Sequence, residues 1–118
     1  MNQALSLSLL DVAKLTWPRV PNKGSATFAE YCKFLYDQKE DIWTICSENG
    51  SELEGMIAAK NTAGVLYVTM FVTLKPGALE KFTSRLEAIF GTITILKYLR
   101  RGREKTVNFE KFKQRTIL

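Results

Sequence analysis

The chain has 118 residues, 46% of them hydrophobic and 25% charged, with a formal net charge of +5, and these values are typical of one folded domain. No apolar run approaches the roughly 20 residues of a membrane span, and residues 1–10 lack the pattern of a secretory signal, so we expect a cytoplasmic protein without a membrane partner. Because histidine is absent and Cys32 and Cys46 are the only cysteines, we expect neither a metal site nor an imidazole-activated nucleophile.

The N-terminal third of the chain predicts two helices. Apolar residues recur at helical spacing over Ala4–Trp17, and Pro18 ends that pattern. The sequence Thr27-Phe-Ala-Glu30 has the form of a capping box, in which the Thr and Glu side chains each satisfy a backbone N–H group at a helix start. We therefore expect a second helix that begins after Thr27 and extends to about Gln38.

Three strands are expected next, over Asp41–Ser47, Leu53–Lys60 and Val65–Thr73. The dipeptide Asn49-Gly50 is a strong hairpin signal because both residues tolerate positive φ, and the sequence Asn61–Gly64 predicts a second turn. The three strands then form a meander. The third is apolar at nearly every position, which predicts burial under helices on both faces.

A third helix and a fourth strand complete the predicted core. The apolar stripe of Leu79–Phe90 indicates a helix that ends at Gly91. Thr92–Leu99 predicts a strand beside the third, reached by a right-handed crossover. For Thr106–Phe109 the pattern leaves two alternatives open, a short edge strand or the start of a last helix capped by Asn108. The predicted class is α/β, with a mostly antiparallel sheet flanked by helices in the order α-α-β-β-β-α-β.

Positive charge is concentrated near the C-terminus. Residues 97–118 contain eight of the 17 basic residues and two of the 12 acidic ones, so this segment carries +6 and the rest of the chain −1. We expect a single domain, 1–118, with a basic C-terminal tail. Such a tail can contact nucleic acid, an anionic cofactor or an acidic protein surface, or it can simply be solvated. The candidate contacts are Arg100, Arg101, Arg103 and Lys105.

The junction between the third strand and the third helix is the first candidate ligand site. A strand that ends at a helix N-terminus directs unpaired N–H groups and the positive end of the helix dipole at one point, which favours phosphate. Here the sequence is Lys75-Pro76-Gly77. The alternative is an ordinary connection with Pro76 at the first helical position.

The order of elements over residues 4–99 resembles the core of the GNAT superfamily of N-acetyltransferases without its first strand. Tyr67–Phe90 resembles that family's fourth strand, pyrophosphate loop and third helix, although the loop is contracted and Pro76 supplies no N–H. The resemblance implies an acetyl-CoA cofactor and acetyl transfer to an amine that the sequence does not identify.

The same resemblance implies a set of site residues. Backbone groups of Phe71 and Val72 would face the pantetheine arm, and Lys75, Gly77 and Ala78 would face the pyrophosphate. Glu54 is the nominated base and Tyr98 the group that protonates the thiolate. The alternative makes the apolar residues core, Glu54 an exposed strand position and Tyr98 a half-buried ring.

The segment that begins at Tyr98 also resembles small GNAT-like proteins encoded by bacteriophages, some of which are virion proteins without enzymatic activity. That resemblance implies a non-enzymatic alternative, an assembly protein that contacts nucleic acid or a protein partner. Aromatic residues near both ends of the chain would then cover the interface of a homo-oligomer or a virion.

Overall fold

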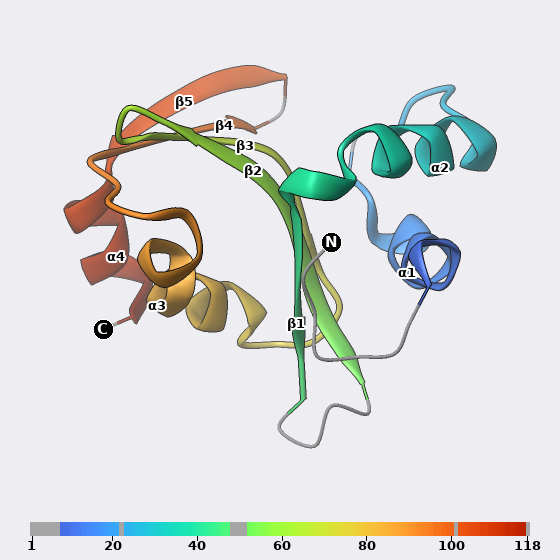
Figure 1. The fold of residues 1–118 in the computed structure, drawn as a ribbon, viewed down its shortest axis with the longest axis horizontal. Coiled ribbons are helices and arrows are strands. Elements are labelled where there is room, and N and C mark those ends of the chain that lie inside the picture. The colour runs from blue at the N-terminus through green and yellow to red at the C-terminus, as the bar shows by residue number, and fades with distance from the viewer. Residues whose placement is uncertain (1–7, 22, 48–51, 101, 118) are drawn as a thin grey trace.

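The computed structural model describes residues 8–21, 23–47, 52–100 and 102–117. Five strands form one mixed sheet in the order β1-β2-β3-β4-β5, antiparallel except for the parallel β3–β4 pair. Helices α1 and α2 cover one face, and α3 and α4 cover the other (Figure 1). The elements are α1 (Leu9–Thr16), α2 (Phe28–Asp37), β1 (Ile42–Cys46), β2 (Leu53–Thr62), β3 (Val65–Thr73), α3 (Ala78–Phe90), β4 (Ile95–Arg100), β5 (Arg103–Asn108) and α4 (Phe109–Ile117).

This architecture confirms the predicted class, a mostly antiparallel sheet flanked by helices. It extends the predicted order by two elements, β5 and α4, at the C-terminal end. The fourth strand lies beside the third in parallel orientation, as a crossover through α3 requires.

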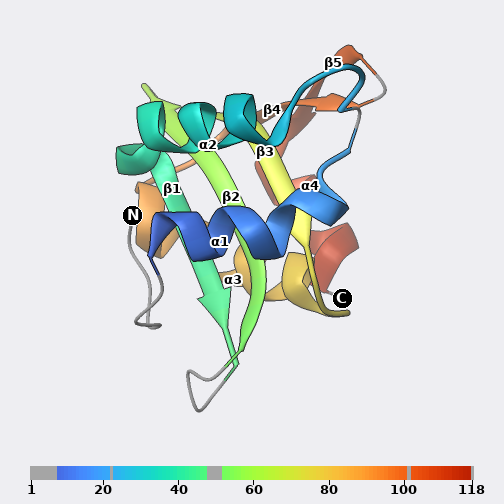
Figure 2. The same cartoon turned by 90° about the vertical axis from the view of Figure 1, so that its right-hand side faces the viewer.

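The two N-terminal helices lie side by side across the sheet (Figure 2). The first begins later than predicted, at Leu9, because Ser8 and Asp11 form a capping box that the sequence reading missed; residues 4–7 lie outside the described residues. The second is confirmed, with Thr27 as its cap. A buried hydrogen bond of 2.6 Å between the Thr16 and Tyr31 hydroxyls joins the two helices.

The β-turns set the register of the meander. Strands β1 and β2 pair antiparallel as expected, although Asn49-Gly50 lies outside the described residues. The second hairpin turns at Ala63 and Gly64, whose φ angles of 53° and 85° suit a tight two-residue connection. At the far end of α3 the Asn61 side chain donates to the carbonyl oxygens of Phe90 and Thr92, and so fixes that end against the hairpin.

The hydrophobic core has two parts, one on each face of the sheet. Tyr31, Leu35, Ile42 and Met56 belong to the part under α1 and α2, and Phe82, Leu86 and Phe109 belong to the part under α3 and α4. The third strand, predicted to be buried under helices on both faces, does pack against the core on both faces but is only partly buried. Residues 55–59 of β2 are all buried, whereas in β3 only Leu66 and Val72 are. β2 lies between both helix pairs, but α1 and α2 stop short of the outer part of β3, where Tyr67 is 43% exposed.

The basic C-terminal segment is folded into the domain. β5 pairs with β4 along its whole length, and Phe109, the first residue of α4, has no exposed surface. Both alternatives for residues 106–109 hold, because the strand ends at Asn108 and the Asn108 side chain then accepts a hydrogen bond from the Lys111 N–H at 3.1 Å.

Replacing Phe109 by alanine should lower the free energy of unfolding by about 3–5 kcal/mol, because the ring fills the core beneath α3. Urea denaturation measures this change. Lys111→Ala, on the exposed side of the same helix, is the control and should stay within about ±0.5 kcal/mol. Equal stability of the two variants would show that α4 is not part of the core.

Candidate ligand cleft between β3 and β4

The parallel pair β3–β4 separates partway along its length. Its register runs from Val65 opposite Ile95 to Val68 opposite Tyr98. Beyond that point β3 continues to Thr73 beside β2, while β4 continues to Arg100 beside β5. In the described part of the sheet, residues 69–73 of β3 therefore have a strand partner on one side only.

A β-bulge lies where the two strands part. In the β2–β3 register Ala58 faces Met70 and Ala59 faces Val68, so Thr69 is an extra residue in β3. A bulge bends its strand and increases the local twist. The Thr69 hydroxyl donates to the Ala58 carbonyl at 3.1 Å, which holds the bulge in place. The bend thus directs the second half of β3 away from β4.

The gap is an open cleft of about 620 Å³ that extends beneath α3 and α4. Its walls are mainly apolar. The principal contributors are Val68, Phe71, Phe82, Leu86, Leu96 and Phe112, and Val20 and Pro21 also line it. A cleft of this size and lining is typical of a small-molecule site.

A tyrosine and two arginines are among the polar residues that line the cleft. Tyr98 and Arg100 come from β4, and Arg115 comes from the last turn of α4. Both arginines are also exposed to solvent, so they lie at the opening. Among the described residues that line the cleft, none is Asp or Glu. Neither arginine forms an ion pair within the part of the chain that the structure describes.

The β4–β5 register places more positive charge on this face. Leu96 faces Val107, Tyr98 faces Lys105 and Arg100 faces Arg103. Leu96 and Val107 pack in the core under α3 and α4, and alternate residues of a strand share a face. Arg103 and Lys105 are therefore on the side of the cleft. Of the four basic residues predicted from the sequence, three share this face, and Arg101 lies outside the described residues.

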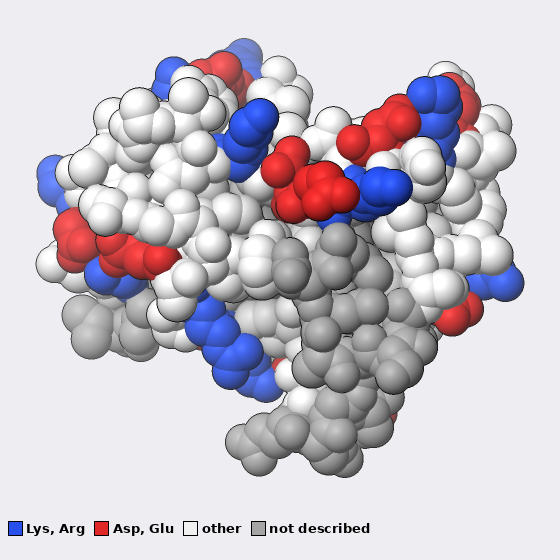
Figure 3. All heavy atoms as spheres, viewed as in Figure 1, with Lys and Arg blue, Asp and Glu red and all other residues white. Residues whose placement is uncertain are grey.

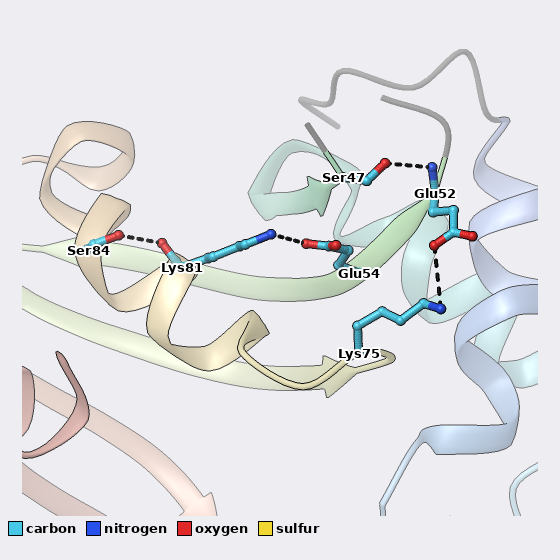
Figure 4. A network of polar contacts seen from close by, with 6 residues as sticks. All are labelled: Ser47, Glu52, Glu54, Lys75, Lys81 and Ser84. Atoms are coloured by element: carbon cyan, nitrogen blue, oxygen red, sulfur yellow. Dashed lines mark hydrogen bonds and ion pairs between the residues drawn. The ribbon is translucent and has the colours of Figure 1, made fainter. Parts of the chain in front are cut away.

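Polar groups of the turn predicted to bind phosphate are already bonded to other groups of the protein. The N–H groups of Leu74 and Lys75 both donate to the Glu54 carbonyl, at 2.9 and 3.2 Å. The Lys75 ammonium extends to Glu52, with 3.4 Å between Nζ and Oε2 (Figure 4). Gly77, with φ 89°, is the residue that precedes the helix, so Pro76 lies before the cap and not at the first helical position.

The other nominated residues are divided between the cleft and the rest of the molecule. Phe71 lines the cleft, whereas the side chain of Val72 packs under α1 and α2, and Ala78 is buried. Tyr98 lines the cleft, but Glu54 does not; its carboxylate is paired with Lys81 of α3 (Figure 4). The structure therefore does not bring the two nominated catalytic residues together in the cleft.

Helices α3 and α4 are joined beside the cleft by one lysine. Lys113 Nζ lies 3.2 Å from Glu110 Oε1 and 3.4 Å from Glu87 Oε1 of α3. Its hydrogen bond to Glu110 raises the pKa of Lys113 above the ordinary value; desolvation opposes this increase, and the hydrogen bond to Glu87 adds a smaller contribution that raises the pKa. Lys113 is therefore paired with two carboxylates, whereas Arg115 forms no ion pair with the described residues.

No group of three or more potential metal ligands occurs among the described residues. In the same part of the chain, no helix combines the length and the apolar character that crossing a membrane requires. No protein-family model matches the chain, and neither does any curated protein.

The sequence did not indicate that Arg100 and Arg115 line the same cleft. Arg100 was placed in the basic cluster, and Arg115 was counted only in the charge of the segment. No local pattern links two arginines that are 15 residues apart in the chain. Their common place at the cleft depends on how α4 packs relative to β4.

Gly55 of β2 allows α3 to pack closely on the sheet, where α3 lines one side of the cleft. A Cβ atom at this position would lie 3.1 Å from both Ala78 Cβ and the Val72 carbonyl oxygen, and 3.2 Å from Phe82. We expect Gly55→Ala to lower the free energy of unfolding by about 1–3 kcal/mol through overpacking. Urea denaturation would test this, with the exposed Ser84→Ala on α3 as control. An unchanged midpoint for Gly55→Ala would mean that α3 does not pack so closely.

Proposed function

We propose that this protein is a GNAT-like acyl-CoA-binding domain, with the acyl-pantetheine arm in the cleft between β3 and β4. One observation carries the proposal, the separation of β3 from β4 at the Thr69 bulge beside a mainly apolar cleft. A pantetheine arm is a narrow, extended chain with two amide groups. The free side of β3 beyond Val68 offers backbone hydrogen-bonding groups to such a chain, much as a neighbouring strand would.

For acetyl transfer to an amine, we assign Tyr98 as the group that protonates the departing thiolate, because its side chain lines the cleft. Glu54 is a poor base in this arrangement, because it is paired with Lys81 and does not line the cleft. Removal of the amine proton would then fall to water. The acceptor amine would enter through the cleft's opening.

The alternative, a basic surface for nucleic acid or an acidic partner, is favoured by the shared face of Arg100, Arg103 and Lys105. On the face seen in Figure 3, however, Lys and Arg side chains are interspersed with Asp and Glu. The cluster on this face of the hairpin is also short, which suits a compact anion better than a long phosphate backbone.

Calorimetry with acetyl-CoA tests the main proposal. Wild-type protein should bind it, and Thr69→Trp should weaken binding by about tenfold or more, because the indole fills the point where the strands part. Thr73→Trp is the matched control, an exposed threonine of the same strand that does not line the cleft, and its affinity should stay near that of wild type.

The opposite outcomes are equally definite. If folded wild-type protein shows no binding at millimolar acetyl-CoA, the acyl-CoA proposal fails. Binding of a short DNA duplex that weakens steeply between two salt concentrations would instead support the basic-surface alternative.

A further inference from the structure

Two arginines at the opening of the cleft have no carboxylate partner in the described part of the chain. Arg100 ends β4, and Arg115 lies in the last turn of α4. Both line the cleft, and both remain exposed. Guanidinium groups bind carboxylate and phosphate through paired hydrogen bonds, and their attraction to an anion is stronger beside an apolar wall than in open water.

The β4–β5 hairpin adds a second, independent observation. Arg100 is directly opposite Arg103, and Lys105 is opposite Tyr98, on the same face. Like charges directly opposite each other on one face of an antiparallel pair are destabilising. A bound anion would relieve this repulsion, which gives the folded protein a reason to prefer the occupied state.

We infer that Arg100 and Arg115 form the anion-binding subsite of this cleft, for an amphipathic ligand whose apolar arm lies between β3 and β4 and whose phosphate or carboxylate meets the two guanidinium groups. For a CoA thioester the inference rests on the proposed function, and it moves the phosphate contacts away from the turn at Lys75. The subsite itself is supported independently by the apolar lining of the cleft and by the two arginines, which are unpaired among the described residues.

The charges around the turn that follows β3 support this assignment. Near the turn, Lys75 is paired with Glu52 and Lys81 with Glu54, and Glu80 adds a further carboxylate in the first turn of α3. The N–H groups of Leu74 and Lys75 are already bonded to a carbonyl. A phosphate at the turn would therefore meet negative charge, whereas a phosphate at the arginines would meet none from the residues that line the cleft.

Three probes and four variants test the subsite by calorimetry. CoA carries the arm with its phosphates, pantetheine carries the arm alone, and decanoate carries an apolar chain with a carboxylate. Arg100→Gln and Arg115→Gln should each lower the affinity for CoA or decanoate by about tenfold or more, as expected for a lost charge-assisted hydrogen bond. The affinity for pantetheine should stay nearly unchanged.

Arg85→Gln is the matched control, because Arg85 is an exposed arginine of α3 that does not line the cleft. Lys75→Gln tests the turn. Both should bind all three probes as wild type does. All four side chains are exposed, so thermal unfolding of the variants should remain close to that of wild type.

The outcomes separate the inference from the proposed function. If CoA binds equally well to both cleft-arginine variants, or only Lys75→Gln weakens it, the subsite is wrong and the acyl-CoA function stands. Equal affinity of wild-type protein for CoA and pantetheine would also overturn the subsite. If decanoate alone binds, and does so through Arg115, the subsite stands and the acyl-CoA function fails. If none of the three probes binds, both fail.

Discussion

A single extra residue in β3 determines the site. Thr69 has no partner residue in the β2 register, so it forms a bulge. The Thr69 hydroxyl stabilises this bulge by donating a hydrogen bond to the Ala58 carbonyl oxygen. Backbone pairing between β3 and β4 ends at the adjacent residue, Val68. A regular register through this point would allow the two strands to remain paired and would close the cleft, since a parallel ladder leaves no space between neighbouring strands. The cleft is therefore open because β3 and β4 do not pair beyond Val68.

The opening is tolerated because the surrounding core is continuous on both faces. β2 carries five consecutive buried residues and anchors both helix pairs, while Phe82, Leu86 and Phe109 fill the space under α3 and α4. Lys113 of α4 then forms an ion pair with Glu87 of α3. β3, β4, α3 and α4 thus all contribute residues to the cleft, and Arg100 and Arg115 lie at its opening, with Arg103 and Lys105 of β5 on the same face of the sheet. An apolar interior with arginines at the opening is the basis of our proposal that the ligand is an extended chain that ends in an anion.

Much of the fold follows from local signals in the sequence. The capping box at Thr27, the positive φ turn at Gly64 and the stop at Gly91 are each contained in a few residues, and the structure has all three. Two other features are not determined by local signals. The burial of β2 rather than β3 depends on how far α1 and α2 extend over the sheet. The double role of residues 106–109, as strand and then helix, depends on pairing between β5 and β4.

The sequence by itself determined the class of the fold and most element positions, since these depend on periodicity and short-range capping. Its composition also shows that the chain has no histidine for imidazole chemistry. It also singled out Phe71, Tyr98 and Arg100, which do line the cleft. Only the tertiary structure decided that Glu54 and Lys75 are paired with other side chains, and that Arg115 lines the same cleft as Arg100. Ion pairs and convergent side chains join residues far apart in the chain, and their positions are fixed by a register shift and by helix packing, neither of which has a periodic signature in the amino-acid sequence.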